Sequence, residues 1–396
     1  MIRNFSKSSS RAKGSAIRQI MKLMADPNII SLGGGNPSPK SFPVEDVRKI
    51  CDDMLKEKGI TMLQYGVTCG YDPLRDAYLE HIVRPKGIKA ERDDVTIFTG
   101  SGQGIFLTMD IFIDEGDVVL MENPTFLGTL NVVQKLGAKC VPVEMDDDGI
   151  IIEDLEAKVK VHKPKLLYTI PTFQNPTGRS LPAERRKRIA ELAAEYNFIV
   201  LEDDPYGDVR FKGQPIPPIK SFDQTGNVIL MNSFSKIISP GLRVGASVAA
   251  EDIAAKLELV KQGADTHSPI LTQAICAEFL NRGLLPGQLE KIAELYGTQF
   301  AAMHEGIKQF FPADCHYTEP EGGLFTWLRL PGISDTTHLL EKAIKECQVA
   351  FVPGEPFFLD GHSEKDCIRL NYSSSSQEQI MIAMERLGGL IKRERK

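Results

Sequence analysis

The sequence predicts an α/β protein in which a large domain, built on a mostly parallel β-sheet, is joined to a smaller α+β domain. Short apolar runs alternate with amphipathic helical stretches from Val95 onward, and beyond about Ile253 long helices and a second group of strands follow. The chain of 396 residues also exceeds the ~100–200 residues of one ordinary domain. Together these observations favour two domains of unequal size.

Six short apolar runs in the first part of the chain are typical of buried strands. They are Val95–Thr99, Asp117–Met121, Lys139–Val143, Leu166–Ile170, Phe198–Leu201 and Val228–Met231. Helical patterns occupy most gaps between them, at Gly104–Ile113, Phe126–Leu136, Ile152–Val159 and Pro182–Tyr196. Because parallel strands need crossover connections, this alternation predicts a sheet that helices cover on both faces.

The last third of the chain has a different pattern. Long helices are expected at Ala255–Ala264, Pro269–Asn281 and Pro286–Phe311, and the last of them is a candidate link between domains. Strands at Leu324–Leu330, Val349–Val352 and Cys367–Tyr372, with helices at His338–Cys347 and Gln377–Lys392, then form a compact α+β unit. We place the large domain at residues 46–284, and the small domain with an N-terminal arm at residues 1–45 and 285–396.

Composition and charge argue against several classes of protein. A net charge of −6 and a pI near 5.8 provide no basic surface for nucleic acid. The seven cysteines are scattered without a C-x-x-C pair and the histidines lack ligand spacing, so we expect no metal site, no disulfide framework and a reducing compartment. No apolar run approaches the ~18 residues of a membrane helix.

The N-terminal segment leaves one ambiguity about location. Residues 1–25 contain several arginines, lysines and serines but no acid, which is the composition of an organelle transit peptide. We interpret the segment as a solvated arm leading into the first helix, and we expect a cytoplasmic protein that binds neither membrane nor nucleic acid.

Two segments at predicted strand ends contain residues suited to catalysis and anion binding. Asn232–Gly245 holds Lys236 in a glycine-rich turn, and a lysine forms a Schiff base with an aldehyde when burial or a neighbouring cation lowers its pKa. Phe98–Gly104 joins a strand to a helix and leaves backbone N–H groups free for an anion, although its spacing matches neither a P-loop nor a dinucleotide motif. Taken alone, the first is a solvated lysine and the second a tight turn.

Two further segments follow the same pattern. Phe198–Tyr206 runs from an apolar strand directly into carboxylates, and a buried carboxylate needs a partner such as a protonated pyridine nitrogen. Asp204, next to Pro205, also suits a simple turn. Pro171–Gly178 contains common turn formers and is by itself only a turn.

In order, these motifs resemble the fold-type I pyridoxal-phosphate (PLP) aminotransferases. They are G-S-x-Q-G, E-N-P-T-F, N-P-T-G, E-D-D-P-Y, S-F-S-K with P-G-L-R-V-G, and C-I-R-L-N-Y. Ser31–Pro37 and Leu63–Gly66 resemble the branch that contains 2-aminoadipate/kynurenine aminotransferases and the aminotransferase-like domains of MocR regulators. The resemblance extends from about Ser15 to Tyr372. It implies a seven-stranded large-domain sheet, PLP as cofactor, and a homodimer that shares its active sites.

The resemblance implies a role for each residue that touches the cofactor ring. Lys236 would form the Schiff base and move the substrate Cα proton, while Asp203 would keep the pyridine nitrogen protonated. Tyr206 and Asn175 would donate to the phenolate oxygen, and Phe126 would stack on the ring face.

The resemblance also implies a set of phosphate contacts made of backbone amides, hydroxyls and a guanidinium. These residues are Ser101, Gly102, Ser233, Ser235 and Arg243, with Tyr65 reaching in from the other subunit. Many relatives have glutamine at the position of Gly102, so one side-chain contact to the phosphate would be missing here.

Substrate contacts are implied for a second set of residues. Arg369 would grip the α-carboxylate, a planar task for which lysine is less suited, with Asn175 and Gly35 beside it. Arg18 matches the position that binds the distal carboxylate of diacids in relatives. A solvated arginine on a short amphipathic helix is the alternative at this position.

The implied reaction is a ping-pong transfer of an amino group between an amino acid and a 2-oxo acid. The amino acid would be aminoadipate-like, aromatic or branched, and the acceptor 2-oxoglutarate. One alternative is a non-catalytic PLP-binding sensor, which would need an N-terminal winged helix for which the residues before Ser31 leave no room. The other alternative is a PLP-dependent lyase, decarboxylase or racemase on the same scaffold.

Overall fold

The computed structural model describes residues 5–12, 26, 28–359 and 364–395, and its centre is a seven-stranded sheet in the order β2-β10-β9-β8-β7-β3-β4. Its strands are β2 (Val95–Phe98), β3 (Val118–Glu122), β4 (Lys139–Val143), β7 (Leu166–Thr169), β8 (Ile199–Asp204), β9 (Val228–Ser233) and β10 (Gly245–Val248). β10 runs antiparallel to both of its neighbours, and the other pairs are parallel. The predicted fold class is therefore confirmed.

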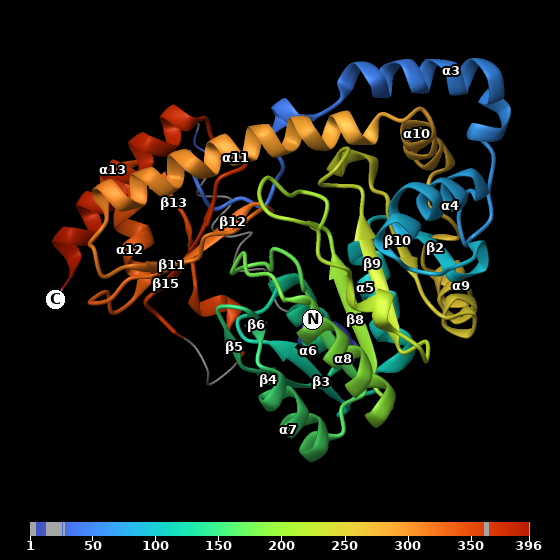
Figure 1. Ribbon diagram of the computed structural model, residues 1–396, viewed down its shortest axis with the longest axis horizontal. Coiled ribbons are helices and arrows are strands. Elements are labelled where there is room, and N and C mark those ends of the chain that lie inside the picture. The colour runs from blue at the N-terminus through green and yellow to red at the C-terminus, as the bar shows by residue number, and fades with distance from the viewer. Residues whose placement is uncertain (1–4, 13–25, 27, 360–363, 396) are drawn as a thin grey trace.

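Helices cover both faces of this sheet, as the alternation predicts (Figure 1). They are α5 (Ser101–Phe112), α6 (Leu127–Leu136), α7 (Ile152–His162) and α8 (Ala183–Tyr196). Successive side chains of a strand point to opposite faces. Leu120 of β3 accordingly packs into the core under α7 and α8, whereas its neighbours Val119 and Met121 pack into the core that contains α5 and α6.

Three long helices, α9 (Glu251–Asp265), α10 (Ile270–Asn281) and α11 (Leu285–Phe310), follow the sheet. Figure 1 shows α11 running from the end of α10 to the small C-terminal unit, where it packs along α13 (Gln377–Glu394). At the other end α3 (Val44–Met62) and α4 (Asp72–Tyr78) pack on α10. Within the described residues, none of the helices is both long enough and apolar enough to cross a membrane.

The small unit has a four-stranded sheet in the order β11-β12-β15-β14. Its strands are β11 (His316–Tyr317), β12 (Phe325–Arg329), β15 (Cys367–Asn371) and β14 (Val352–Pro353). The helix expected at His338–Cys347 begins slightly earlier, as α12 (Thr336–Lys342), and continues as a π-helical turn, η7 (Ala343–Cys347).

The single strand predicted at Val349–Val352 is wrong. Two strands form instead, because β13 (Val349–Ala350) pairs in parallel with β1 (Ile30–Ser31), whereas β14 pairs antiparallel with β15. The chain therefore changes partners at the buried Phe351. An apolar run alone does not show this change, because both pieces are fully buried. β1 pairs with β13 of the C-terminal unit, whereas α1 (Lys7–Arg11) packs on α6 of the large domain. The domain boundaries, including the placement of residues 1–45 with the small domain, stay a prediction.

Candidate active site

Side chains that follow β7, β8 and β9 meet at a cavity of about 360 Å³. The carboxyl ends of parallel strands lie at one edge of a sheet, and this edge is where open α/β proteins bind ligands. Of the predicted site residues that the structure describes, the lining contains all except Arg243 and Tyr65. Its members are Gly35, Asn36, Ser101, Gly102, Ile105, Phe126, Ile170, Asn175, Asp203, Pro205, Tyr206, Ser233, Ser235, Lys236, Phe325 and Arg369.

Lys236 lies in the turn that follows β9, and its amine points into the cavity. Nζ donates a hydrogen bond to the carbonyl oxygen of Gly35 at 2.7 Å. Burial, and then the positive charges of Arg369 and Arg243, lower the pKa of Lys236 to about 8. About a tenth of this amine is therefore neutral and nucleophilic at pH 7, far more than for a lysine with the ordinary pKa of about 10.4.

Alternation along β8 decides which of three consecutive acids reaches the cavity. Glu202 points to the opposite face, where it accepts hydrogen bonds from the backbone N–H groups of Ile219 and Lys220, both at 2.8 Å. Asp204 accepts the N–H of Gly207 at 2.8 Å and so forms part of a turn. Asp203 alone lines the cavity.

The two oxygens of Asp203 differ in their surroundings. Oδ2 accepts the hydroxyl of Tyr168 at 2.7 Å, whereas Oδ1 is buried and has no hydrogen-bond donor among the described residues. Burial raises the pKa of Asp203 to about 7, although the Tyr168 hydrogen bond opposes this rise. A buried acceptor without a donor, facing a cavity, fits a protonated ring nitrogen.

Arg369 projects from β15 into the other side of the cavity. Nη1 donates to Oδ1 of Asn175 at 2.9 Å and Nη2 to the carbonyl oxygen of Gly33 at 2.7 Å, while the buried Nε has no acceptor within the described part of the chain. The guanidinium lies 4.2 Å from the ring centroid of Phe325 and 5.2 Å from that of Phe357. Burial lowers the pKa of Arg369 to about 10. The group remains a cation at neutral pH, and it is suited to a carboxylate.

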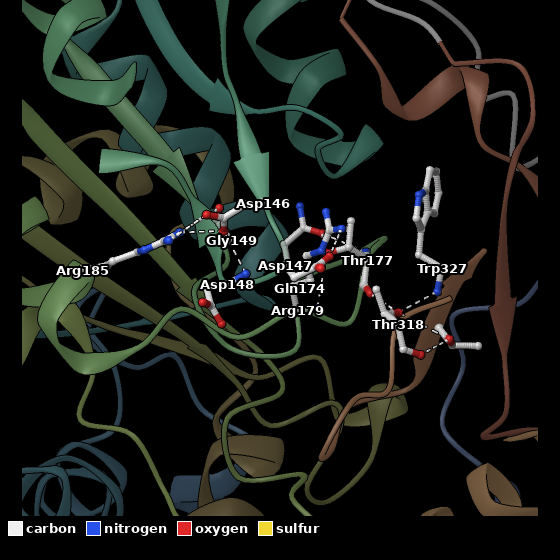
Figure 2. Close-up of polar contacts among 11 residues, drawn as sticks. Asp146, Asp147, Asp148, Gly149, Gln174, Thr177, Arg179, Arg185, Thr318 and Trp327 are labelled. Carbon is white, nitrogen blue, oxygen red and sulfur yellow. Dashed lines mark hydrogen bonds and ion pairs between the residues drawn. The ribbon is translucent and has the colours of Figure 1, made fainter. Parts of the chain in front are cut away.

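The loop after β7 presents Asn175 to the cavity, and the side chain of Gln174 organises that loop. Oε1 of Gln174 accepts both the N–H and the hydroxyl of Thr177, at 2.8 and 2.7 Å, and Nε2 donates to the buried Glu122 at 2.9 Å. Figure 2 shows Gln174 and Thr177 beside Thr318 of the small unit, whose hydroxyl donates to the carbonyl oxygen of Thr177 at 2.6 Å. The loop is therefore fixed from both sides.

A candidate site for an anion lies where β2 passes into α5, and we refer to it as the anion-binding end. Gly100 has φ +80°, and α5 begins at Ser101 with its first amides directed toward the cavity end that Ser233 and Ser235 also line. Gly245 passes so close that a Cβ there would lie 2.4 Å from the Ser101 nitrogen. Only glycine allows this approach of two backbones.

Two predicted site residues in the described part of the chain do not line the cavity, and a third is not described. Arg243 is exposed, yet its Nη2 donates to the carbonyl oxygen of Thr99 at 3.3 Å, which puts the guanidinium beside Gly100 at the anion-binding end. Tyr65 is 83% exposed, and its ring meets His267 edge-on at 5.7 Å. Arg18 lies outside the described residues.

Sequence reasoning missed Tyr168, Gln174 and Glu122 as members of the site. Tyr168 could have been found, because β7 and β8 are adjacent and Tyr168 and Asp203 each lie near the end of their strand. Glu122 is the last residue of β3, and burial raises its pKa to about 7. It could also have been found, because it is a second carboxylate at the end of an apolar strand. Gln174 carries no such signal, because its role depends on the folded loop.

The family model described as aminotransferase class I and II matches residues 27–387. An aromatic-amino-acid aminotransferase of Thermococcus litoralis is 39% identical over 99% of this chain and 95% of its own. A 2-aminoadipate transaminase of Thermus thermophilus is 38% identical over 98% and 96%. The crystal structure of Pyrococcus horikoshii kynurenine aminotransferase, in complex with PMP, superimposes with a TM-score of 0.95 at 38% identity, covering 99% of this chain and 98% of that one. These findings confirm the resemblance that the motifs predict.

The hydrogen bond from Tyr168 yields a prediction about the cofactor-free protein. Because that bond stabilises ionised Asp203, Tyr168→Phe is expected to raise the pKa of Asp203 above about 7. Carbon-13 NMR of the labelled carboxyl as a function of pH measures the change. Tyr78→Phe is the matched control, because Tyr78 is equally buried but donates to Asn232 at 2.6 Å. An unchanged titration in Tyr168→Phe would contradict the assignment.

Proposed function

This chain belongs to the class I and II aminotransferases, and we propose that it transfers an amino group between 2-oxoglutarate and an aromatic, branched or aminoadipate-like amino acid by a ping-pong mechanism. It is a PLP-dependent aminotransferase that acts on amino acids and 2-oxo acids. The observation that carries the proposal is a single cavity. It holds a buried amine on Lys236, an Asp203 oxygen without a donor and the Arg369 guanidinium.

Bound PLP supplies an aldehyde and a pyridinium ring that withdraws electrons from the substrate Cα. We propose that Asp203 Oδ1 would accept a hydrogen bond from the protonated ring nitrogen. Tyr206 and the Asn175 amide would donate hydrogen bonds to the phenolate oxygen. Asn175 keeps its amide donor for this task, because its Oδ1 already accepts from Arg369. Phe126 lines the cavity where a ring face would stack.

The phosphate would lie at the anion-binding end. Donors there are the amides at the start of α5, the hydroxyls of Ser233 and Ser235, and the fork of Arg243. Lys236 would have two roles in the proposal: it would hold the cofactor through its aldehyde, and its free amine would accept and return the proton of the substrate Cα. A pKa of about 8 suits an amine that must accept and return a proton.

Substrate selection would depend on the rest of the lining. Arg369 binds the α-carboxylate, with Gly35 and Asn175 beside it, and Phe325 offers an apolar wall. Among the described residues that line the cavity, Lys236 and Arg369 are the cations, and both already have a task. A distal carboxylate therefore needs a cation from elsewhere, which we propose is Arg18.

We propose a homodimer whose active sites are complete only when two copies associate. Large apolar side chains are exposed at and after the end of α3: Ile60 at 90%, Leu63 at 77% and Val67 at 57%, with Tyr65 at 83% among them. Exposed apolar clusters of this kind mark interaction surfaces. A second copy covering this segment would bring Tyr65 to the phosphate of its partner. We also propose a cytoplasmic location, which the scattered cysteines support.

A substrate panel tests the reaction. The purified protein, incubated with single amino acids and 2-oxoglutarate, is expected to form glutamate with aromatic, branched or aminoadipate-like donors, and Lys236→Ala is expected to form none. Release of ammonia or CO2 instead of glutamate would favour a lyase or decarboxylase. Bound PLP without turnover of any donor would favour the sensor.

The two arginines are expected to differ in their effects. Arg369→Ala removes a buried cation from every substrate complex and should lower kcat/KM by about 100-fold for all donors. Arg18→Ala should lower kcat/KM only for diacids, including glutamate. Steady-state kinetics with phenylalanine, leucine and 2-aminoadipate separates these outcomes, and equal losses across the panel in Arg18→Ala would remove its proposed role.

A charge in the exposed apolar segment should prevent association. Leu63→Asp is expected to shift the protein toward monomers in sedimentation velocity and to lower activity with it. Val161→Asp is the control, because Val161 is 74% exposed on α7, away from this segment. A Leu63→Asp variant that keeps the wild-type mass would contradict the proposed interface.

A further inference from the structure

An ion pair with a buried lysine lies behind the anion-binding end and takes no part in the chemistry described above. The side chain of Lys261 in α9 is fully buried, and its Nζ donates to Oδ1 of Asp265, whose side chain is 24% exposed, at 2.5 Å. A buried lysine costs several kcal/mol unless it is paired, so such a pair in an enzyme calls for an explanation. Asp265 supplies one through its second oxygen.

Oδ2 of Asp265 accepts two hydrogen bonds from the junction of β2 and α5. The hydroxyl of Thr99 donates at 2.6 Å and Nε2 of Gln103 donates at 2.8 Å. The same Gln103 side chain turns its Oε1 to the backbone N–H of Thr99, at 2.8 Å. One carboxylate therefore fixes both Thr99 and Gln103.

These two residues flank the segment 100–102, which carries the amides of the anion-binding end. The positions before and after Gly100, Ser101 and Gly102 are thus held by one group, while the carbonyl of Thr99 also accepts Arg243. Two glycines in three residues leave this segment with little conformational restriction of its own. External anchors are needed if its N–H groups are to be fixed before an anion arrives.

The charges of the pair explain why an acid is tolerated near a site for a dianion. An isolated carboxylate would repel phosphate, but Lys261 neutralises Asp265 and leaves it a strong acceptor. The hydroxyl of Ser268 also lies 2.9 Å from that of Thr99, so the loop after α9 joins the same network.

We propose that Asp265, held in place by Lys261, is a positioning residue for the cofactor phosphate. It orients Thr99 and Gln103 so that the amides between them face the phosphate in a fixed geometry. This inference rests on the proposed function, since it takes Ser101 and Gly102 as phosphate contacts.

The test compares the affinity of the cofactor-free protein for PLP with its affinity for pyridoxal, which lacks the phosphate. Replacing the pair by Lys261→Met with Asp265→Asn leaves no unpaired buried charge. This double variant is expected to bind PLP about tenfold more weakly, with pyridoxal affinity unchanged. The absorption of the bound cofactor measures both, and a merely structural role would weaken both ligands alike and overturn the proposal.

The Lys220–Asp223 pair provides a matched control. It is similarly buried, at 10% and 3% side-chain exposure and 2.9 Å, but it lies next to the start of β9, at the opposite end of that strand from Ser233. Lys220→Met with Asp223→Asn should leave the ratio of PLP to pyridoxal affinity as in the wild type. A similar selective loss in this control would also overturn the proposal.

If the double variant is unstable, two smaller substitutions at Thr99 test the role of Asp265. Thr99→Val is close in shape but removes the hydroxyl that Asp265 accepts, whereas Thr99→Ser keeps it. The valine variant should lose PLP affinity selectively and the serine variant should retain it, and equal behaviour of the two would refute the role of Asp265.

The wild-type protein separates this inference from the proposed function. If it binds PLP no more tightly than pyridoxal, the phosphate contacts themselves are wrong and both proposals fail. If it prefers PLP and every variant keeps that preference, only the role of Asp265 fails.

Discussion

Desolvation of Arg369 is the constraint on which the substrate side of the cavity depends. Removing a cation from water costs several kcal/mol unless hydrogen bonds and a counter-charge replace the solvent. The protein supplies two acceptors, from Asn175 and Gly33, and two aromatic faces, but no carboxylate among the described residues forms an ion pair with it. Because these partners come from the N-terminal segment, the loop after β7 and the small unit, the site depends on all three being packed together.

The opposite side of the cavity depends on strand geometry. Three acids follow one another at the end of β8, and the two-residue period of a strand sends Glu202 to the far face and Asp203 into the cavity. Tyr168 then occupies one oxygen of Asp203 and leaves the other without a donor. The cavity is thus lined both by the Arg369 cation and by a carboxyl group whose pKa burial raises to about 7.

The sequence predicts six of the seven large-domain strands, because their apolar runs are short and bounded by turns. It misses β10, which directly follows the glycine-rich turn after Lys236. It predicts most of the cavity lining, because motif residues at the ends of parallel strands must meet. The sequence does not predict pairing between strands that are far apart in the chain. The run 349–352 contributes to two strands, of which β13 pairs with β1 and β14 pairs with β15. It also misses Gln174 and Asp265, whose importance depends on groups far away in the chain, and no local pattern distinguishes them from other polar residues.

Because the anion-binding end is formed largely by backbone amides, its donors do not depend on the side chains at those positions. Main-chain amides are present whatever side chain a codon specifies, so many substitutions at position 101 would leave the N–H donor in place. The vulnerable positions are Gly245, where an added carbon would collide with the Ser101 nitrogen, and Gly100, whose φ of +80° strains any other residue. Natural variants of this gene should therefore tolerate change at Ser101 better than at the two glycines, even though the glycines contribute no functional group.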